Sequence, residues 1–151
     1  MVKVGDTLPD VVLEAYPSRG KVRLSDYRGK WVVLYFYPRD DTPGCTKEAC
    51  GFRDSIRQIG EVGAEVVGVS TDNLPSHEKF AIKYGLNFTL LSDPKGELGS
   101  GLGTLKEGGS SMRRVTFLVS PEGRISKIYP RVNPTVHAAE VINDLKSFVG
   151  N

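Results

Sequence analysis

The chain has 151 residues, of which 39% are hydrophobic and 25% are charged, a balance typical of a folded protein rather than a disordered one. Twenty Lys and Arg residues against eighteen Asp and Glu residues leave a net charge of +2, and their scatter argues against a dedicated nucleic-acid binder. No stretch approaches the roughly 20 apolar residues of a membrane span, and the first residues lack the pattern of a secretory signal. We therefore expect a cytoplasmic protein that forms one domain over residues 1–151 and binds no membrane.

The first third of the chain predicts a hairpin followed by a central strand. Alternating apolar residues at 11–15 and 21–24 flank a turn at 17–20 that contains proline and glycine, which is typical of a β-hairpin. Residues 30–37 are β-branched or aromatic almost throughout, and Pro38 follows them. Such a run is typical of a strand that is buried on both faces of a sheet.

Helices and strands then alternate along the chain. Apolar residues recur at helical spacing between Cys45 and Gly60, which predicts a helix there. The elements expected after it are a strand at 64–70, a helix that ends at Gly85, a strand at 88–91, a hairpin of strands at 115–119 and 124–129, and a helix from about 134 to 148. This order predicts an α/β protein with a thioredoxin-like fold, in which a mixed central sheet is flanked by helices and extended by the N-terminal β-hairpin.

One of the two cysteines lies beyond the carboxyl end of a strand, where the functional residues of α/β proteins usually lie. Cys45 lies seven residues after Pro38, beyond the carboxyl end of the central strand and in the first turn of the expected helix. Pro43 suits that first turn, and Gly44 lets a ligand approach the backbone closely. The partial positive charge at a helix start favours an anion, here the Cys45 thiolate. A small buried apolar residue is the alternative interpretation of Cys45.

The second cysteine, Cys50, follows five residues later. One disulfide between two cysteines cannot stabilise a whole chain of this length, and cytosolic proteins rarely depend on disulfides for stability. The only histidines are His77 and His137, so a zinc site made of Cys and His ligands lacks closely spaced partners. We therefore expect a redox role for the cysteine pair, neither a metal nor a cofactor, and both histidines on helix surfaces.

The residues around Cys45 resemble the active-site motif of a known enzyme family. Pro38-x-x-x-Thr42-x-x-Cys45 is similar to the motif of peroxiredoxins, which are thiol peroxidases. The string from Thr42 to Cys50, Thr-Pro-Gly-Cys-Thr-x-Glu-Ala-Cys, resembles the peroxiredoxin Q subfamily, also called bacterioferritin comigratory protein. The resemblance extends over essentially the whole chain, and the further matches are Gly5-Asp6, Ser70-x-Asp72, Leu91-Ser92-Asp93 and Arg114-x-Thr116-Phe117-Leu118-Val119.

This resemblance implies a function and a role for each matching residue. Cys45 would attack hydrogen peroxide or an organic hydroperoxide and become a sulfenic acid, which Cys50 would resolve as an intramolecular disulfide. Thr42 and Arg114 would contact the reacting oxygens, and Pro38 would limit water in the pocket. Thioredoxin or a glutaredoxin-like protein would reduce the disulfide, and the enzyme would act as a monomer.

Some assignments stay open in the sequence. Strand alternation puts only one of Arg113 and Arg114 on the face of the site, and only the resemblance selects Arg114. Glu48 could hold Arg114 or Lys47 in place, or it could be an exposed residue on the helix surface. The glycine-dense stretch at 96–109 lacks the features of a phosphate-binding loop, and we expect a mobile loop near the active site.

Two other functions remain compatible with the cysteine pair. One is a thiol–disulfide oxidoreductase that acts on proteins, although such enzymes usually carry Cys-x-x-Cys and four residues separate the two cysteines here. The other is a binding module whose cysteine pair senses oxidant. Peroxide consumption in an assay coupled to thioredoxin distinguishes the peroxidase from both.

Overall fold

The structure is a computed structural model that describes residues 2–18 and 20–150. Arg19, which falls in the expected hairpin turn, lies outside the described residues, as do Met1 and Asn151. The elements in chain order are β1 (Val12–Tyr16), β2 (Lys21–Arg23), a short 3₁₀ helix (Leu24–Tyr27), β3 (Trp31–Phe36), α1 (Pro43–Glu61), β4 (Ala64–Ser70), α2 (Leu74–Tyr84), β5 (Thr89–Ser92), α3 (Glu97–Leu102), β6 (Val115–Val119), β7 (Ile125–Tyr129) and α4 (His137–Val149). All the helices and strands expected from the sequence are present, and α3 is an addition to them.

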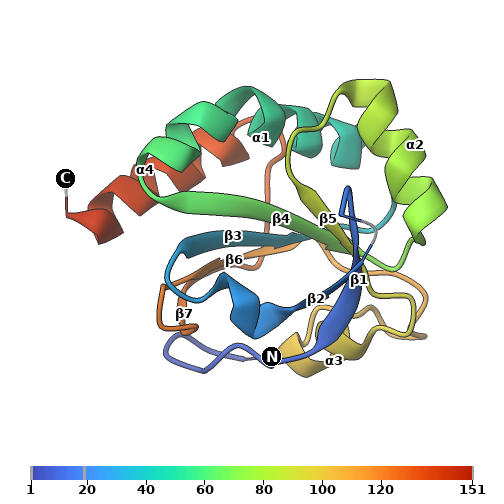
Figure 1. Ribbon diagram of the computed structural model, residues 1–151, viewed down its shortest axis with the longest axis horizontal. Coiled ribbons are helices and arrows are strands. Elements are labelled where there is room, and N and C mark those ends of the chain that lie inside the picture. Colours follow the sequence, from blue (N-terminus) through green and yellow to red (C-terminus); the bar gives the residue numbers. More distant parts are fainter. Residues whose placement is uncertain (1, 19, 151) are drawn as a thin grey trace.

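Within the described residues, seven strands form one mixed sheet in the order β2-β1-β5-β4-β3-β6-β7 (Figure 1). The central strands β3, β4 and β5 run parallel to one another. The two hairpins extend this parallel core on opposite sides, because β1 pairs antiparallel with β5 and β6 pairs antiparallel with β3. The expected mixed sheet with an N-terminal hairpin at one edge is therefore confirmed.

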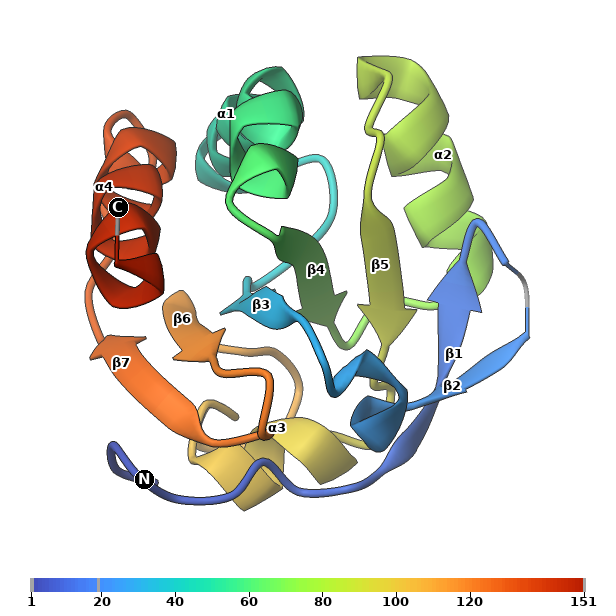
Figure 2. The same ribbon diagram turned by 60° about the vertical axis from the view of Figure 1, so that its left-hand side comes forward.

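Helices cover both faces of this sheet, as expected. Figure 2 shows α1, α2 and α4 over one face, and α3 together with the segment before β1 on the other. Each face encloses its own apolar cluster: Tyr35 and Phe52 belong to the one under α1, and Leu34 and Leu98 to the one above α3. The sheet is thus a central layer between two cores.

Strand β3 contributes to both cores. Its side chains alternate, so Tyr35 enters the cluster under α1 while Leu34 and Phe36 enter the opposite one, and all three are buried. The expectation of a strand buried on both faces is confirmed. The carboxyl end of β3 leads through Tyr37 into the loop at 38–42 and then into α1, so a buried central strand positions the residues around Cys45.

The expectation of a loop throughout the glycine-dense stretch is wrong, because the stretch contains helix α3. Leu98 and Leu102 are fully buried beneath the sheet, and this tertiary packing stabilises a helix too short to form alone. At Gly99, an added Cβ would stand 2.5 Å from the Met112 sulfur. The glycine therefore serves close packing in this segment.

The last helix begins later than the expected residue 134. Residues 133–136 form a turn, in which Asn133 Oδ1 accepts a hydrogen bond from the Thr135 amide at 3.0 Å. Asparagine side chains compete with helical hydrogen bonding in this way, and the regular helix α4 starts only at His137. Neither α4 nor any other helix in the described part of the chain is long and apolar enough to cross a membrane.

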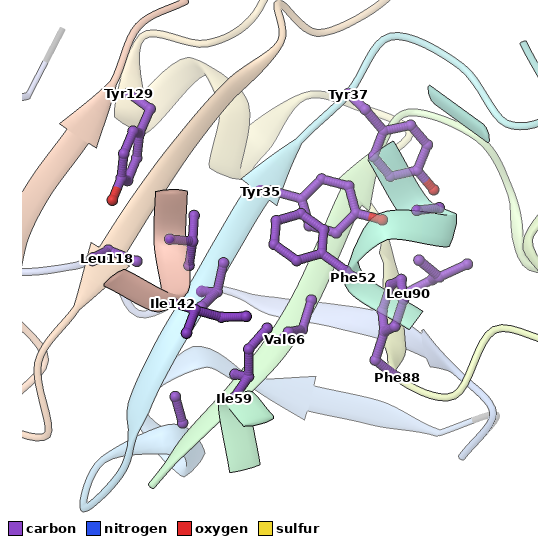
Figure 3. Close-up of a cluster of buried hydrophobic side chains, with 14 of the residues drawn as sticks. Tyr35, Tyr37, Phe52, Ile59, Val66, Phe88, Leu90, Leu118, Tyr129 and Ile142 are labelled. Atoms are coloured by element: carbon purple, nitrogen blue, oxygen red, sulfur yellow. The ribbon is translucent and has the colours of Figure 1, made fainter. Parts of the chain in front are cut away.

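Gly68, in the middle of β4, makes room for an aromatic ring of the core. A Cβ at this position would stand 2.9 Å from Tyr35 Cζ and 3.0 Å from a methyl carbon of Leu90. The Tyr35 ring packs in turn against Phe52 of α1, with the ring centroids 4.8 Å apart (Figure 3). Helix α1 therefore packs on the sheet through a contact that depends on residue 68 being a glycine.

We expect Gly68→Ala to lower the free energy of unfolding by about 1–3 kcal/mol, because the added methyl group overpacks the core. Gly60→Ala is the matched control, since Gly60 lies in α1 and a Cβ there would have no described atom within 4 Å apart from the surrounding backbone of its own helix. Alanine there should stabilise the helix by up to about 1 kcal/mol. Urea denaturation followed by circular dichroism measures both. Equal stabilities of Gly68→Ala and the wild type would contradict this account of the packing.

Candidate active site

The candidate active site forms where the end of β3, the start of α1 and the start of β6 meet. Cys45 lies in the first turn of α1, which begins at Pro43 with Thr42 as the N-cap residue. Cys45 is 1% exposed, Cys50 is half-buried, and both are free cysteines. The expected position of Cys45 at the start of a helix is confirmed.

Arg114 brings a positive charge to the Cys45 sulfur. It directly precedes β6, and the pairing of β6 with β3 carries it to the start of α1. Its Nη2 donates to Cys45 Sγ at 3.4 Å, and its Nη1 donates to Glu48 Oε1 at 2.9 Å. Arg113 is exposed. Of the two neighbouring arginines, Arg114 is therefore the one that faces the cysteine.

Gly44 allows this close approach of the arginine. A Cβ on Gly44 would stand 2.9 Å from Arg114 Nη2, well inside ordinary contact distance. The sequence predicts that a ligand comes close to the backbone here, and in the structure the Arg114 guanidinium takes this space. A larger residue before Cys45 would push the guanidinium away from the sulfur.

Glu48 is the buried partner of Arg114, one helical turn after Cys45. It is 1% exposed, which excludes the open alternative of an exposed glutamate on the helix surface. Burial raises the pKa of Glu48 to about 7, against the lowering effect of Arg114. Burial lowers the pKa of Arg114, but Cys45 and Glu48 together hold it above its ordinary value. The guanidinium is therefore charged and lies between a carboxyl group and a sulfur.

The structure places Thr42 and Pro38 in the loop that leads from β3 into α1. The Thr42 hydroxyl donates to the Arg39 carbonyl oxygen at 3.0 Å, so its hydrogen is engaged there while its lone pairs stay able to accept. Pro38 is half-buried directly beyond β3. Of the residues expected at the site, direct contacts join Cys45 with Arg114, whereas Thr42 and Pro38 flank them in the loop.

Cys50 lies in the same helix as Cys45, five residues further on. In an ideal helix such residues are displaced by about 7.5 Å along the axis and 140° around it, so their Cα atoms are about 8.6 Å apart. A disulfide tolerates little more than about 7 Å and needs Cβ atoms that converge. The two cysteines therefore face different directions here, and a disulfide between them requires the first turns of α1 to unwind.

Both histidines are buried, so the expectation of surface positions is wrong. His77 and His137 are 0% and 1% exposed, because each lies on the helix face that packs on the sheet. The spacing from His77 to Phe80 and from His137 to Val141 is the signal that could have indicated this. His137 Nε2 lies 2.8 Å from the Thr116 hydroxyl oxygen in β6. Each polar ring is thus satisfied by a partner inside the protein.

Sequence reasoning also missed Asp40, which is buried in the loop before α1. Its carboxylate lies within hydrogen-bond distance of the Tyr37 hydroxyl, the Ser76 hydroxyl and the His77 ring. Two adjacent aspartates after a strand are typical of an exposed turn, and no pattern in the sequence indicates that one of them is buried. Tyr37 directly follows β3, whereas Ser76 and His77 come from α2, which only the fold brings to this loop.

Comparisons with known proteins agree with this arrangement. Residues 4–128 match the model of the AhpC/TSA family. The putative peroxiredoxin bcp of Coxiella burnetii and the peroxiredoxin Bcp of Bacillus subtilis are each 41% identical to this chain, covering 95% and 96% of it and 99% and 96% of the relatives. The structure of a cysteine-to-serine mutant of Xylella fastidiosa PrxQ is similar with a TM-score of 0.92 and 36% identity, over 98% of both chains.

Fold and site together define a thioredoxin-fold enzyme that acts through a cysteine thiol. The chain belongs to the AhpC/TSA family, and the relatives it resembles are peroxiredoxins of the Bcp and Q type. The expected resemblance to peroxiredoxin Q and the expected thiol-dependent peroxidase activity are therefore confirmed. Among the similar structures, the bacterioferritin comigratory protein of Xanthomonas campestris, with 32% identity and a TM-score of 0.87 over 95% of this chain and 99% of that one, has alkyl peroxide reduction activity.

The buried carboxyl group of Glu48 should make stability depend on pH. Its pKa in the folded protein, about 7, lies above the ordinary 4.5, so the folded state holds this proton more tightly than the unfolded state does. The protonated Glu48 carboxyl group therefore adds up to about 3 kcal/mol to the free energy of unfolding. This contribution is fully present below about pH 4.5 and is lost as the pH rises through about 7. Glu48→Gln should abolish this part of the pH dependence, which denaturant unfolding across that range measures.

Glu61→Gln is the matched control for this measurement. Glu61 lies at the last turn of the same helix and is exposed, so its variant should keep the wild-type dependence on pH. Parallel stability profiles for Glu48→Gln and the wild type would show that the Glu48 carboxyl group is not perturbed by burial.

Proposed function

We propose that this peroxidase reduces hydroperoxides through Cys45, on the evidence of the contact between Arg114 Nη2 and Cys45 Sγ. A guanidinium 3.4 Å from the sulfur favours the thiolate, which is the nucleophilic form of the side chain. The N-terminal end of α1 adds partial positive charge at the same atom. Two sources of positive charge therefore act on a single buried thiol.

The first chemical step moves one peroxide oxygen onto sulfur. The Cys45 thiolate attacks that oxygen, the O–O bond breaks, and the leaving alkoxide or hydroxide takes up a proton to depart as alcohol or water. Arg114 donates hydrogen bonds to the oxygens on which negative charge develops. The Thr42 hydroxyl accepts from the peroxide O–H, since its own hydrogen is directed to Arg39, and Pro38 limits water in the pocket. Cys45 is left as a sulfenic acid.

The second step regenerates the enzyme through Cys50. Its thiol condenses with the Cys45 sulfenic acid, so that an S–S bond forms and water leaves. Thioredoxin or a glutaredoxin-like dithiol then reduces the disulfide with two electrons. Such a cycle fits the cytoplasm, where dithiol reductants keep cysteines reduced. The two cysteines of this cycle lie in the same helix, so the cycle needs no second copy of the chain, which fits a monomer acting as a single domain over residues 1–151.

Peroxide consumption coupled to thioredoxin and its reductase tests this function. The wild type should turn over repeatedly, and Cys45→Ser should lose all but trace activity at an unchanged melting temperature, because serine provides no comparable nucleophile. Cys50→Ser should consume about one equivalent of peroxide in a burst and then stall as sulfenic acid, which mass spectrometry detects.

Three results would contradict parts of this scheme. Sustained turnover by Cys45→Ser would assign the nucleophile elsewhere, and wild-type turnover by Cys50→Ser with thioredoxin alone would remove Cys50 from the cycle. A wild-type protein that reduces protein disulfides but consumes no peroxide would instead be a thiol–disulfide oxidoreductase. Reversible oxidation of the pair with neither activity would favour the redox-sensing module.

Two neighbouring arginines provide a matched test of the charge at the sulfur. Arg114→Ala should slow the reaction of Cys45 with peroxide by about 10²–10³-fold, because it removes both the stabilisation of the thiolate and a donor to the reacting oxygens. Arg113→Ala removes the same side chain from an exposed position and should react within about twofold of the wild type. Single-turnover oxidation of Cys45 measures both rates. Equal rates for the two variants would remove Arg114 from the peroxide step.

A further inference from the structure

A buried histidine lies behind the loop that carries Pro38 and Thr42. His77, on α2, is fully buried. Its Nε2 lies 2.9 Å from the carbonyl oxygen of Leu91, and its Nδ1 lies 2.7 Å from Asp40 Oδ2. Because a carbonyl oxygen can only accept a hydrogen bond, Nε2 carries a proton.

The second ring nitrogen of His77 also faces an acceptor. Asp40 Oδ1 accepts from the Tyr37 hydroxyl at 2.6 Å, and Asp40 Oδ2 accepts from the Ser76 hydroxyl at 2.8 Å, so each oxygen already accepts a hydrogen bond from a hydroxyl group. A bare lone pair on Nδ1 would point at a carboxylate lone pair across 2.7 Å. A proton on Nδ1 would replace this repulsion by a charge-assisted hydrogen bond, and the ring would then be an imidazolium in a buried ion pair.

This ion pair holds the middle of the loop between β3 and α1. Asp40 lies two residues after Pro38 and two before Thr42, and its backbone N–H donates to Asp72 Oδ2 at 2.8 Å. The next residue, Asp41, has a φ of 55°, a left-handed conformation that costs free energy for any residue with a side chain. Such a conformation persists only where the surroundings hold it. The bonds of Asp40 to α2 and to Asp72 do so, together with those that the Asp41 carboxylate accepts from Lys83 and Tyr84.

We propose that Asp40 and His77 are positioning residues for the peroxide step, because their ion pair fixes the loop that presents Pro38 and Thr42 to Cys45. The proposal rests on the proposed function, since it concerns the geometry in which peroxide meets the sulfur. Removing one partner leaves the other as an uncompensated buried charge, and the loop loses its buried attachment to α2, so that the bonds of Asp41 to Lys83 and Tyr84 at the surface remain. A displacement of about 1 Å in a positioning group can slow a reaction by about 100-fold.

The charge of the pair is tested by nitrogen-15 NMR of the His77 ring. In the wild type at neutral pH, both ring nitrogens should carry a proton, and a ring with a single proton would overturn the ion pair. In Asp40→Asn, the amide can donate to Nδ1 and still accept from Tyr37, so the hydrogen bonds persist around a neutral ring. This variant should fold and show a proton on Nε2 alone, and two ring protons in it would also overturn the assignment.

The positioning role is tested by the rate constant for oxidation of Cys45 by hydrogen peroxide in a single turnover. We expect a loss of about tenfold or more in Asp40→Ala and in His77→Gln, and recovery to within about threefold of the wild type in Asp40→Asn. The later formation of the disulfide with Cys50 should not slow in any of them, because it does not require the loop in place.

Lys79→Ala, an exposed position two residues after His77 on α2, is the control and should keep the wild-type rate. A folded His77→Gln protein that reacts within about twofold of the wild type would overturn the positioning role. Equal slowing of the peroxide and disulfide steps would overturn it as well, because general loosening of the structure affects both. If Asp40→Ala does not fold, His77→Gln carries the comparison, since glutamine keeps a donor for the Leu91 carbonyl.

These outcomes separate the proposal from the function on which it rests. A wild-type protein that consumes no peroxide contradicts the proposed function, while the NMR measurement still decides whether the ion pair exists. A wild type that consumes peroxide, together with unaffected His77→Gln and Asp40→Ala variants, leaves the function intact and removes the positioning role.

Discussion

The position of one guanidinium constrains the whole site. Arg114 has to reach the sulfur of a buried cysteine, and a buried charge is costly unless it is paired and hydrogen-bonded. Glu48 supplies the pairing from the next turn of α1, and Gly44 leaves the space through which the guanidinium passes. Two hydrogen bonds of Arg114 thereby tie the start of β6 to α1. This contact is possible only because the sheet order places β6 beside β3, the strand that leads into α1.

The pair of Arg114 and Glu48 keeps a net positive charge that acts on the Cys45 sulfur. A fully ionised partner would neutralise the guanidinium and weaken its effect on Cys45. Burial instead raises the pKa of Glu48 to about 7, so near neutral pH part of the population carries a protonated carboxyl group. Glu48 then still orients Arg114 by a hydrogen bond while it cancels less of the charge. Depth of burial, and not only the choice of residues, therefore sets the electrostatics of the site.

Features that depend on local periodicity could be predicted from the sequence, and features that depend on distant partners could not. The aromatic and β-branched run before Pro38 predicted the central strand, and helical spacing after Cys45 predicted α1. The selection of Arg114 over Arg113 needed a family resemblance, because strand alternation alone does not say which face is the site. The spacing from His77 to Phe80 could have indicated that His77 is buried, but its polar partners, Asp40 and a carbonyl of β5, have no signature near it in the chain. Helix α3 was missed for the same reason, since its packing beneath the sheet outweighs its glycine content.

Formation of the proposed disulfide requires α1 to unwind in part while the structure around it stays in place. Unwinding has to free the first turns of the helix, and attachments to α2 on both sides bound the segment that can move. On one side, the loop before α1 is held through Asp40 and His77. On the other, Arg53 Nη1 donates to the Tyr84 carbonyl oxygen at 2.6 Å, at the end of α2. Between them lies Gly51, whose low helix propensity reduces the cost of unwinding. Anchors on both sides of the two cysteines confine the rearrangement to this short segment, so the sheet can keep its register and Arg114 its place while Cys45 leaves and returns.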